Sequence, residues 1–376
     1  MRGRQARPVA ALAAIIGTII GVGMFGIPYA VARVGFWPGL LMLGVTTAVT
    51  LYLHVAFGEV VAAAPSTERL GGYTRRFLGQ WAERLANFVA IAGRVGALLA
   101  YLVVGSAFTA TLLAPWIETA RGAGFPVFFI IGALGVWLGI RLVGGLEVPL
   151  VFLLVAGVAA LGWLAHPYVR LEHLAGARLG ELPILYGVLL FALGGIPAIP
   201  EVQSLVADRA TYRRILAWGT IVPAVVYAFF AFVVVGVNGS ATSLEAVSGL
   251  ASALGPVAAF IGAGVGFLAV LTSFFVIGLN LAHILEYDWG WSRSVSRLAT
   301  LGTPVVLFGL GLNDFIRIIG VLGAVLGAAE GILVLMLFER WRGRRSVALL
   351  GVRTRWTSFA VAFMLVAGAV WYVVGV

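Results

Sequence analysis

Long apolar segments separated by short polar ones recur along the whole chain. Each of eleven runs is long enough to cross a hydrocarbon layer about 30 Å thick, which needs roughly 20 residues of helix. We number these runs as spans 1 to 11, centred near Val22, Val49, Leu99, Gly132, Ala156, Leu193, Val226, Leu271, Leu307, Gly327 and Val366. The connecting segments leave no room for a soluble domain. The pattern therefore predicts an all-α membrane protein with one integral membrane domain over residues 1–376.

Two of these spans are interrupted in their middle. Span 1 contains "GTIIGVGMFGIP" (residues 17–28), and span 6 contains "FALGGIPAIPEV" (residues 191–202). Glycine permits unwound torsions, and proline removes amide donors. The interruptions lie five spans apart, so the two helices enter from opposite sides. This spacing is typical of an inverted repeat, which predicts repeats over roughly 8–166 and 183–338 and an extra helix over roughly 356–376.

A broken helix inside a bilayer needs a physical reason. Unpaired backbone groups facing lipid cost several kcal/mol each, so a break persists where it lines a cavity or binds something. A half-helix amino terminus suits a carboxylate, and carbonyls at a carboxyl terminus suit an ammonium group or a sodium ion. A site with both is matched to an α-amino acid. The alternative for one glycine-rich span is a helix-packing surface.

Composition agrees with a membrane location. The chain is 61% hydrophobic with a mean hydropathy of +1.06, against about half apolar residues in soluble domains. The run after Arg2, Arg4 and Arg7 is too long for a signal peptide and leads into further spans, so we expect it to be retained. The chain has no cysteine, which excludes disulfides and thiolate metal sites.

The positive charges predict the orientation. With a cytoplasmic amino terminus, Arg94 lies within span 3 and 19 of the 25 arginines lie in inside segments. The five in outside segments are Arg33, Arg121, Arg170, Arg178 and Arg317. This asymmetry predicts the amino terminus inside and, after eleven spans, the carboxyl terminus outside the inner (plasma) membrane.

Beyond this pattern, the chain resembles the amino acid/polyamine/organocation superfamily of transporters. "GTIIGVGMFGIPYA" is followed after span 2 by "GEVVAAAPSTERLGGY", and "FALGGIPAIPEV" and "LTSFFVIGLNLAHIL" are similar to the amino acid/auxin and hydroxy/aromatic amino acid permease branches. The bacterial aromatic-acid members usually have a histidine in the span 6 break, where this chain has "LGG". That departure argues against aromatic substrates.

The resemblance implies a leucine-transporter-type fold, with five-plus-five inverted repeats, and ion-coupled secondary transport of amino acids by alternating access. By position, the amides of Gly21, Val22 and Gly23 would meet the substrate carboxylate. The ammonium group would meet carbonyls near Thr18 and at Phe191, Ala192 and Gly194, with Phe191 also a gate or wall. Neither break contains a charged side chain, so we expect neutral amino acids, the smaller aliphatic ones first.

The resemblance also implies a cation site. Thr272 and Ser273 in span 8 would supply hydroxyls, completed by carbonyls of Gly17, Ile20 and Ala269. Such oxygen ligands suit sodium. The alternative is that the two hydroxyls bond back to their own helix and that the transporter is driven by protons.

Ionisable side chains within the spans are further candidates because intramembrane charge is costly. Glu59, Arg94, Glu201 and Glu330 are candidates for coupling or gating. For Arg94 and Glu330 the alternative is a structural ion pair, and we expect Arg94 to pair with a carboxylate. For Glu59 and Glu201 the alternative is a solvated span end.

Other classes of function fit less well. An enzyme in the membrane would need a catalytic constellation, and the sequence has no H-E-x-x-H motif, no cysteine and aspartates only near the span ends. A transporter of another organic solute or of a metal ion on the same fold stays open. We expect no cofactor beyond a coupled sodium ion or proton. The expected partners are an amino acid and the lipid bilayer, with no nucleic acid, in a monomer or small homo-oligomer.

Overall fold

The structure is a computed structural model that describes residues 7–64, 68–117, 119–139, 143–206, 208–343, 348–349 and 352–375. In these residues the chain is almost entirely helical. The α-helices are α1 Pro8–Ile19, α2 Gly23–Val34, α3 Phe36–Ala63, α4 Leu70–Leu78, α5 Gln80–Leu113, α6 Ala120–Leu138, α7 Val143–Ala165, α8 Leu182–Ala192, α9 Ile199–Leu205, α10 Arg209–Asn238, α11 Val247–Leu254, α12 Pro256–His283, α13 Arg293–Gly309, α14 Phe315–Val321, α15 Ala328–Arg342 and α16 Thr354–Gly375. Two strands, β1 Ala348–Leu349 and β2 Val352–Arg353, pair antiparallel just before α16.

Each predicted span corresponds to a helix or to a broken pair of helices. Spans 2 to 5 are α3, α5, α6 and α7, and spans 7 to 9 and 11 are α10, α12, α13 and α16. Among the described residues, eight helices are long and apolar enough to cross a membrane, and the bent pair α1 and α2 makes a ninth. The remaining two predicted spans are α6, a shorter apolar helix, and α13.

The two predicted breaks are present and differ in form. In span 1, α1 and α2 are separated by residues 20–22 and meet at a bend of 52°. In span 6, α8 ends at Ala192, and a 3₁₀ turn over Ile196–Ala198 leads into α9. A third irregularity, the π-helix Leu322–Gly327, lies between α14 and α15 in span 10. π-Bulges occur often at functional sites.

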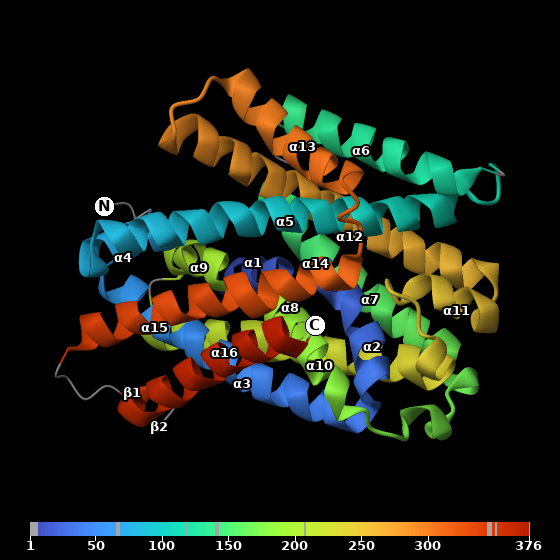
Figure 1. The fold of residues 1–376 in the computed structure, drawn as a ribbon, viewed down its shortest axis with the longest axis horizontal. Coiled ribbons are helices and arrows are strands. Elements are labelled where there is room, and N and C mark those ends of the chain that lie inside the picture. Colours follow the sequence, from blue (N-terminus) through green and yellow to red (C-terminus); the bar gives the residue numbers. More distant parts are fainter. Residues whose placement is uncertain are drawn as a thin grey trace.

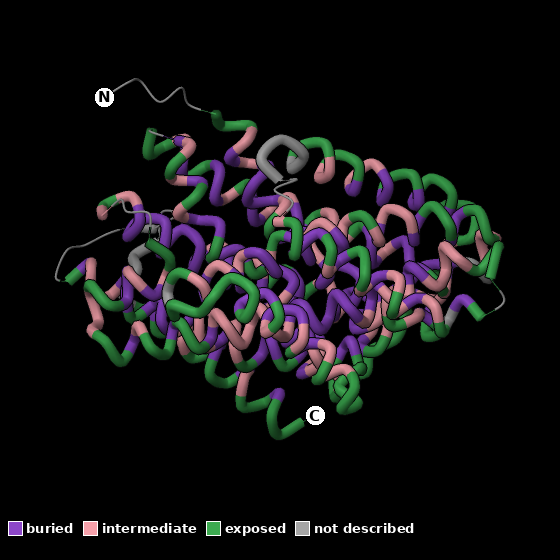
Figure 2. Tube along the Cα trace, turned by 90° about the horizontal axis from the view of Figure 1, so that it is seen from above, coloured by how far each residue is buried: buried purple, intermediate pink, exposed green. Residues whose placement is uncertain are grey.

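The helices form one bundle whose interior is occupied by the broken spans. In Figure 1, α6 and α13 lie along one edge beside α12, α16 lies toward the opposite edge beside α15, and α1 lies between them. Buried residues are concentrated in the middle of the bundle and exposed residues on its outside (Figure 2). Exposed Leu, Phe and Trp side chains are numerous on the outer helices, as expected for a surface that faces lipid.

Glycines let the backbone of span 10 lie directly on α8. A Cβ on Gly187 would lie 2.3 Å from the carbonyl oxygen of Gly320, and a Cβ on Gly323 would lie 1.9 Å from that of Gly187. Small residues are the usual means of such approach between membrane helices. The π-helix is thereby packed against the helix that ends in the span 6 break.

Local sequence signals mark the starts of several helices. Asp208, Ser292 and Asp314 are N-caps whose side chains accept a hydrogen bond from the amide three residues on. Hydrogen bonding from the Thr211 hydroxyl and from the Thr211 amide, which lies 2.7 Å from the Asp208 carboxylate, lowers the pKa of this exposed carboxyl group. The segment between spans 2 and 3 contains the short helix α4.

Candidate functional site

Both breaks line one cavity of about 290 Å³, which we call the central cavity. Its wall includes Gly21, Val22 and Gly23 from span 1 and Phe191, Ala192 and Gly194 from span 6, together with Thr18. Helices α3, α5 and α12 and span 10 complete the wall. All seven residues predicted to bind substrate therefore surround the same space.

The span 1 break presents two open amides. The Gly21 amide is used locally, because it donates to the Ile19 carbonyl at 2.9 Å in a tight turn over Ile20. The amides of Val22 and Gly23, at the start of α2, have no acceptor among the described residues. The Gly21 amide therefore already has a backbone acceptor in this arrangement, and its role at the substrate carboxylate stays a prediction. Two amides at the positive end of the α2 dipole fit a carboxylate.

The facing carbonyls at the span 6 break are partly engaged. The Phe191 carbonyl accepts from the Gly194 amide at 3.2 Å. The buried Tyr227 hydroxyl of α10 lies 3.0 Å from the Ala192 carbonyl oxygen and 2.7 Å from that of Ile19, so it bridges the ends of α8 and α1. Each carbonyl keeps a second lone pair for an ammonium group. Tyr227 is marked in the sequence only as a hydroxyl within an apolar run.

Gly23 allows the two breaks to touch. A Cβ there would lie 2.8 Å from the Ala192 Cα and 3.1 Å from the Phe191 ring. A Cβ on Gly21 would meet only the Tyr101 hydroxyl, at 3.8 Å. The two glycines of the motif therefore differ in role. Only Gly23 is required for the close approach of the span 1 break to the end of α8.

His54 of α3 holds the span 6 break from the side. Its Nε2 accepts a hydrogen bond from the Gly195 amide at 3.1 Å, and its Nδ1 lies 2.8 Å from the Thr220 hydroxyl of α10. The ring is 1% exposed, so it has no alternative partner in water. His54 was not among the site residues predicted from the sequence. A histidine within the apolar run "LYLHVAF" is nevertheless the kind of intramembrane ionisable residue that marks a functional site.

Charged side chains lie in the central cavity away from the breaks. Arg94 donates from Nε to the Asn280 side chain at 2.8 Å and from Nη1 to the Ala90 carbonyl at 2.7 Å. Among the described residues no carboxylate lies within ion-pair distance of Arg94, so the expected ion pair is wrong. Glu330 and Glu201 also line the cavity. An amide and a helix carbonyl take the place of the carboxylate because they reach the guanidinium from α12 and from its own helix.

Glu59 lies outside the central cavity. Its buried carboxylate is bonded by Arg209 and Arg213, at the start of α10. These ion pairs join the carboxyl-terminal end of α3 to the amino-terminal end of α10. The arginine pattern predicts that both of these helix ends lie on the cytoplasmic side. Glu59 is therefore neither solvated nor in contact with the cavity that holds the other three ionisable candidates.

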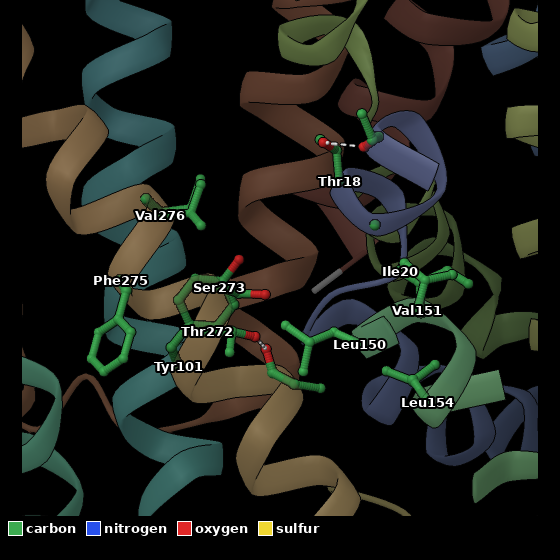
Figure 3. Close-up of a pocket in the computed structure, with 14 residues that line it drawn as sticks. Thr18, Ile20, Tyr101, Leu150, Val151, Leu154, Thr272, Ser273, Phe275 and Val276 are labelled. Atoms are coloured by element: carbon green, nitrogen blue, oxygen red, sulfur yellow. Dashed lines mark hydrogen bonds between the residues drawn. The ribbon is translucent and has the colours of Figure 1, made fainter. Parts of the chain in front are cut away.

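A second space, the side cavity of about 140 Å³, adjoins the central one between α1, α7 and α12. All five predicted cation-site residues line it: Gly17, Ile20, Ala269, Thr272 and Ser273. Figure 3 shows Thr272 and Ser273 on one side and, on the other, Thr18 of α1 and Ile20 of the span 1 break. The Thr272 hydroxyl bonds back to the carbonyls of Leu268 and Ala269, at 2.9 and 3.1 Å. This donation leaves the oxygen lone pairs available to a cation.

The two sides of the breaks differ. The central cavity extends from the breaks toward one face of the bundle. Helices α1 and α5 begin at this face, and α3, α9, α12 and α15 end there. On the other side Phe25, immediately past the span 1 break, packs edge-on against Phe108 at 4.9 Å and Phe230 at 6.1 Å between ring centroids. All three rings are at most 2% exposed. The site is hollow toward one face and sealed by aromatic rings toward the other.

Comparison with known proteins agrees with this geometry. The sequence profile of the tryptophan/tyrosine permease family matches residues 5–375. The chain belongs to this family. It is 21% identical over 327 residues to glutamine transporter 2 of Aliivibrio fischeri, covering 82% of this chain and 83% of the relative. It is 22% identical over 379 residues to tyrosine-specific transport system 1 of Haemophilus influenzae, covering 94% and 92%.

The fold is also that of a solved structure. The crystal structure of MhsT in complex with L-phenylalanine superposes with a TM-score of 0.72 over all of both chains, at 14% identity. The predicted leucine-transporter-type membrane fold is confirmed. The protein is an amino acid permease and not an enzyme, as its sequence predicts. The boundaries of the two repeats and the roles of individual site residues stay predictions.

Proposed function

We propose that this permease is a cation-coupled symporter of neutral amino acids that works by alternating access in the plasma membrane. The observation that carries this proposal is the pair of breaks in one cavity, where the open amides of Val22 and Gly23 face carbonyls at the end of α8. This arrangement matches the carboxylate and ammonium groups common to all amino acids. The apolar Phe191 ring beside it suits an uncharged substrate side chain.

The restriction to neutral substrates rests on the charges near the breaks. Arg94 is the cationic side chain in the cavity wall, and its Nε and Nη1 donors are already engaged by Asn280 and Ala90. An anionic substrate side chain would therefore be buried without a free cationic partner, which is expensive. Glu201 and Glu330 line the same cavity, so the exclusion of lysine and arginine rests on the names of the relatives instead. The two curated relatives are named for glutamine and tyrosine, both neutral. Their names favour neutral amino acids without ranking small ones above large ones.

The side cavity is the proposed site of the coupled cation. Its hydroxyl and carbonyl oxygens come from α1 and α12, and Thr18 and Tyr101 line both cavities. Oxygen ligands of this kind suit a hard monovalent ion such as sodium. Because Ile20 belongs to the break that would bind the substrate carboxylate, a cation there would stabilise the break and raise substrate affinity.

The arginine asymmetry supports an orientation with the start of α1 in the cytoplasm and the carboxyl terminus outside. With this orientation the central cavity extends toward the cytoplasm, and the Phe25, Phe108 and Phe230 rings close the outer side. The arrangement corresponds to the inward-facing half of an alternating-access cycle.

Counterflow in proteoliposomes tests the proposal. Liposomes loaded with one unlabelled amino acid at a time are diluted into a labelled neutral one, with and without a sodium gradient. We expect neutral amino acids to drive label accumulation and lysine, arginine, aspartate and glutamate not to do so. The order among aliphatic, amide and aromatic side chains follows from the same series. A charged amino acid that drives accumulation better than every neutral one would contradict the proposal.

A further inference from the structure

We propose that His54 is a proton-binding site that operates the span 6 break, with Nε2 binding either the Gly195 amide or a proton. The inference deepens the proposed transport function and rests on it. It concerns a group that contributes neither to the two-break site for the amino acid nor to the side cavity for the cation.

The hydrogen bonds define the protonation state of His54 in this arrangement. Nε2 accepts from the Gly195 amide, so it carries no hydrogen. In a neutral ring the hydrogen is then on Nδ1, which donates to the Thr220 hydroxyl. The Thr220 hydroxyl in turn donates to the Leu216 carbonyl at 2.8 Å. Every donor in this chain has one acceptor, and the direction of each bond follows from the first.

Protonation is incompatible with this chain of bonds. The lone pair of the imidazole that can bind a proton is on Nε2, where it accepts from the Gly195 amide. Once protonated, Nε2 becomes a donor and its N–H would point at the N–H of Gly195. The Gly195 amide must then leave. A proton and the closed form of the break therefore compete for one lone pair, and by linkage acid favours every conformation in which Gly195 is released.

The surrounding packing makes the release a discrete movement. A Cβ on Gly195 would lie 2.9 Å from His54 Cε1 and 2.9 Å from two side-chain carbons of Ile19. The backbone of the break is thus seated between α3 and the end of α1 with no room to slide. Loss of the bond between Gly195 and His54 therefore moves the span 6 break as a unit. Close-packed interiors change between discrete arrangements rather than deforming gradually.

Protons can reach His54 through the central cavity, whose wall includes it. The ionisable groups facing this cavity are Glu201 from α9, Arg94 and Tyr101 from α5, and Glu330 from α15. Tyr227 on α10, the helix that supplies Thr220, is a further titratable neighbour of the break. Carboxylates favour protonation of His54 and Arg94 opposes it. His54→Gln keeps an acceptor for the Gly195 amide but cannot bind a proton. This variant therefore distinguishes a proton-binding role of His54 from a purely structural one.

The test uses cysteine labelling, for which this chain without cysteine is well suited. Gly93 lines the central cavity, and a Cβ there meets no atom within 4 Å. The full-length Gly93→Cys protein in liposomes is treated with a membrane-impermeant thiol reagent, without substrate. The labelling rate is divided at each pH by the rate of Gly93→Cys combined with His54→Gln, which cancels the titration of the thiol itself. We expect this ratio to fall at least about threefold from about pH 7.5 to about pH 5.5, because acid moves the protein out of the arrangement with the open cavity.

Two further variants keep the proposal testable. His166→Gln removes an exposed histidine whose Nδ1 lies 2.6 Å from the Trp163 carbonyl, and it must leave the ratio unchanged. Thr220→Val removes the acceptor for Nδ1–H, which matters most for the charged ring, so the midpoint of the pH response should move to lower pH. If His54→Gln does not fold, the labelling rate of Gly93→Cys is divided instead by that of Gly93→Cys combined with Thr220→Val, and the difference between their midpoints is the readout.

A ratio that stays constant with pH would overturn the proposal, as would a midpoint unmoved by Thr220→Val. Neither result would bear on the amino acid site, because the labelling is done without substrate. Conversely, a pH-dependent ratio in a protein that shows no counterflow of any amino acid would leave His54 as a proton site and refute the proposed transport function.

Discussion

The two breaks achieve the same result by different means. In span 1 the interruption is short, and a turn closed by its own backbone, from the Gly21 amide to the Ile19 carbonyl, forms it. In span 6 the interruption is longer, and side chains of other spans hold it: His54 binds the Gly195 amide, and Tyr227 binds the Ala192 carbonyl. Tyr227 also binds the Ile19 carbonyl at the end of α1, so both breaks share the contact with α10 and only the second has the contact with His54 of α3.

This difference indicates which break moves more easily. A turn made by local backbone bonds persists when neighbouring helices shift, whereas bonds to side chains on other helices are lost when those helices separate. We therefore expect changes in α3 to act on span 6 and changes in α10 to act on both breaks. Four variants, one of them a double substitution, test the two breaks and the sites beside them. They are given in order from the largest expected loss of transport to the smallest.

Gly23→Leu should abolish transport. Its side chain would enter the backbone of Ala192, 2.8 Å from the position of a Cβ, and would fill the space in front of the open amides. Uptake of a labelled neutral amino acid should fall to background while the amount of protein in the membrane stays normal. Gly44→Leu on α3 is the control, because a Cβ there meets nothing within 4 Å. Uptake at the wild-type rate by Gly23→Leu would show that the two breaks need not touch.

Replacing Thr272 and Ser273 together by alanine should remove sodium dependence. If their hydroxyls bind the cation, substrate binding should weaken through linkage by about 1–3 kcal/mol, measured as the substrate Kd with and without sodium. Thr303→Ala is the matched control, since its hydroxyl makes the same back-bond, to Ala299 at 2.8 Å, on α13. Equal uptake in sodium-free buffer under a proton gradient would contradict sodium coupling.

Tyr227→Phe should weaken both breaks without changing the cavity volume. It leaves the Ala192 carbonyl without its donor, a loss of about 1–3 kcal/mol for a buried group, and leaves the Ile19 carbonyl with the Gly21 amide alone. We expect a lower melting temperature and slower uptake. Tyr372→Phe on α16 is the control, because the hydroxyl of its buried side chain bonds to the Arg317 carbonyl of α14 at 3.4 Å, outside both breaks. Equal losses in the two variants would mean that Tyr227 has no special role at the breaks.

Phe191→Ala should broaden selectivity toward larger side chains. The ring lines the cavity at the end of α8, and discrimination among apolar groups is worth only about 1–3 kcal/mol per methylene. Competition by large and small neutral amino acids against one label measures the change. An unchanged order of competitors would place the side-chain pocket away from Phe191.

The sequence alone was sufficient for the architecture. Runs of about 20 apolar residues predict spans whatever packs around them, because a bilayer imposes length and composition on each helix separately. The breaks could be found for the same reason, since "GVGMFGIP" and "LGGIPAIP" disfavour a continuous helix locally. Thr272 and Ser273 line the side cavity beside the first break, where the resemblance implies a cation, and their role as its ligands stays a prediction.

Only the tertiary structure decided how the break in span 6 is satisfied and which charges meet. Gly195 is paired with His54 from span 2 and Ala192 with Tyr227 from span 7, residues 141 and 35 positions away in the chain. Arg94 binds Asn280 rather than a carboxylate, and Glu59 binds two arginines of α10. A hydrogen bond depends on positions within a few tenths of an ångström, which the packing of helices far apart in sequence sets. The sequence shows where a membrane helix must break, and the helices around it determine what holds the break in place.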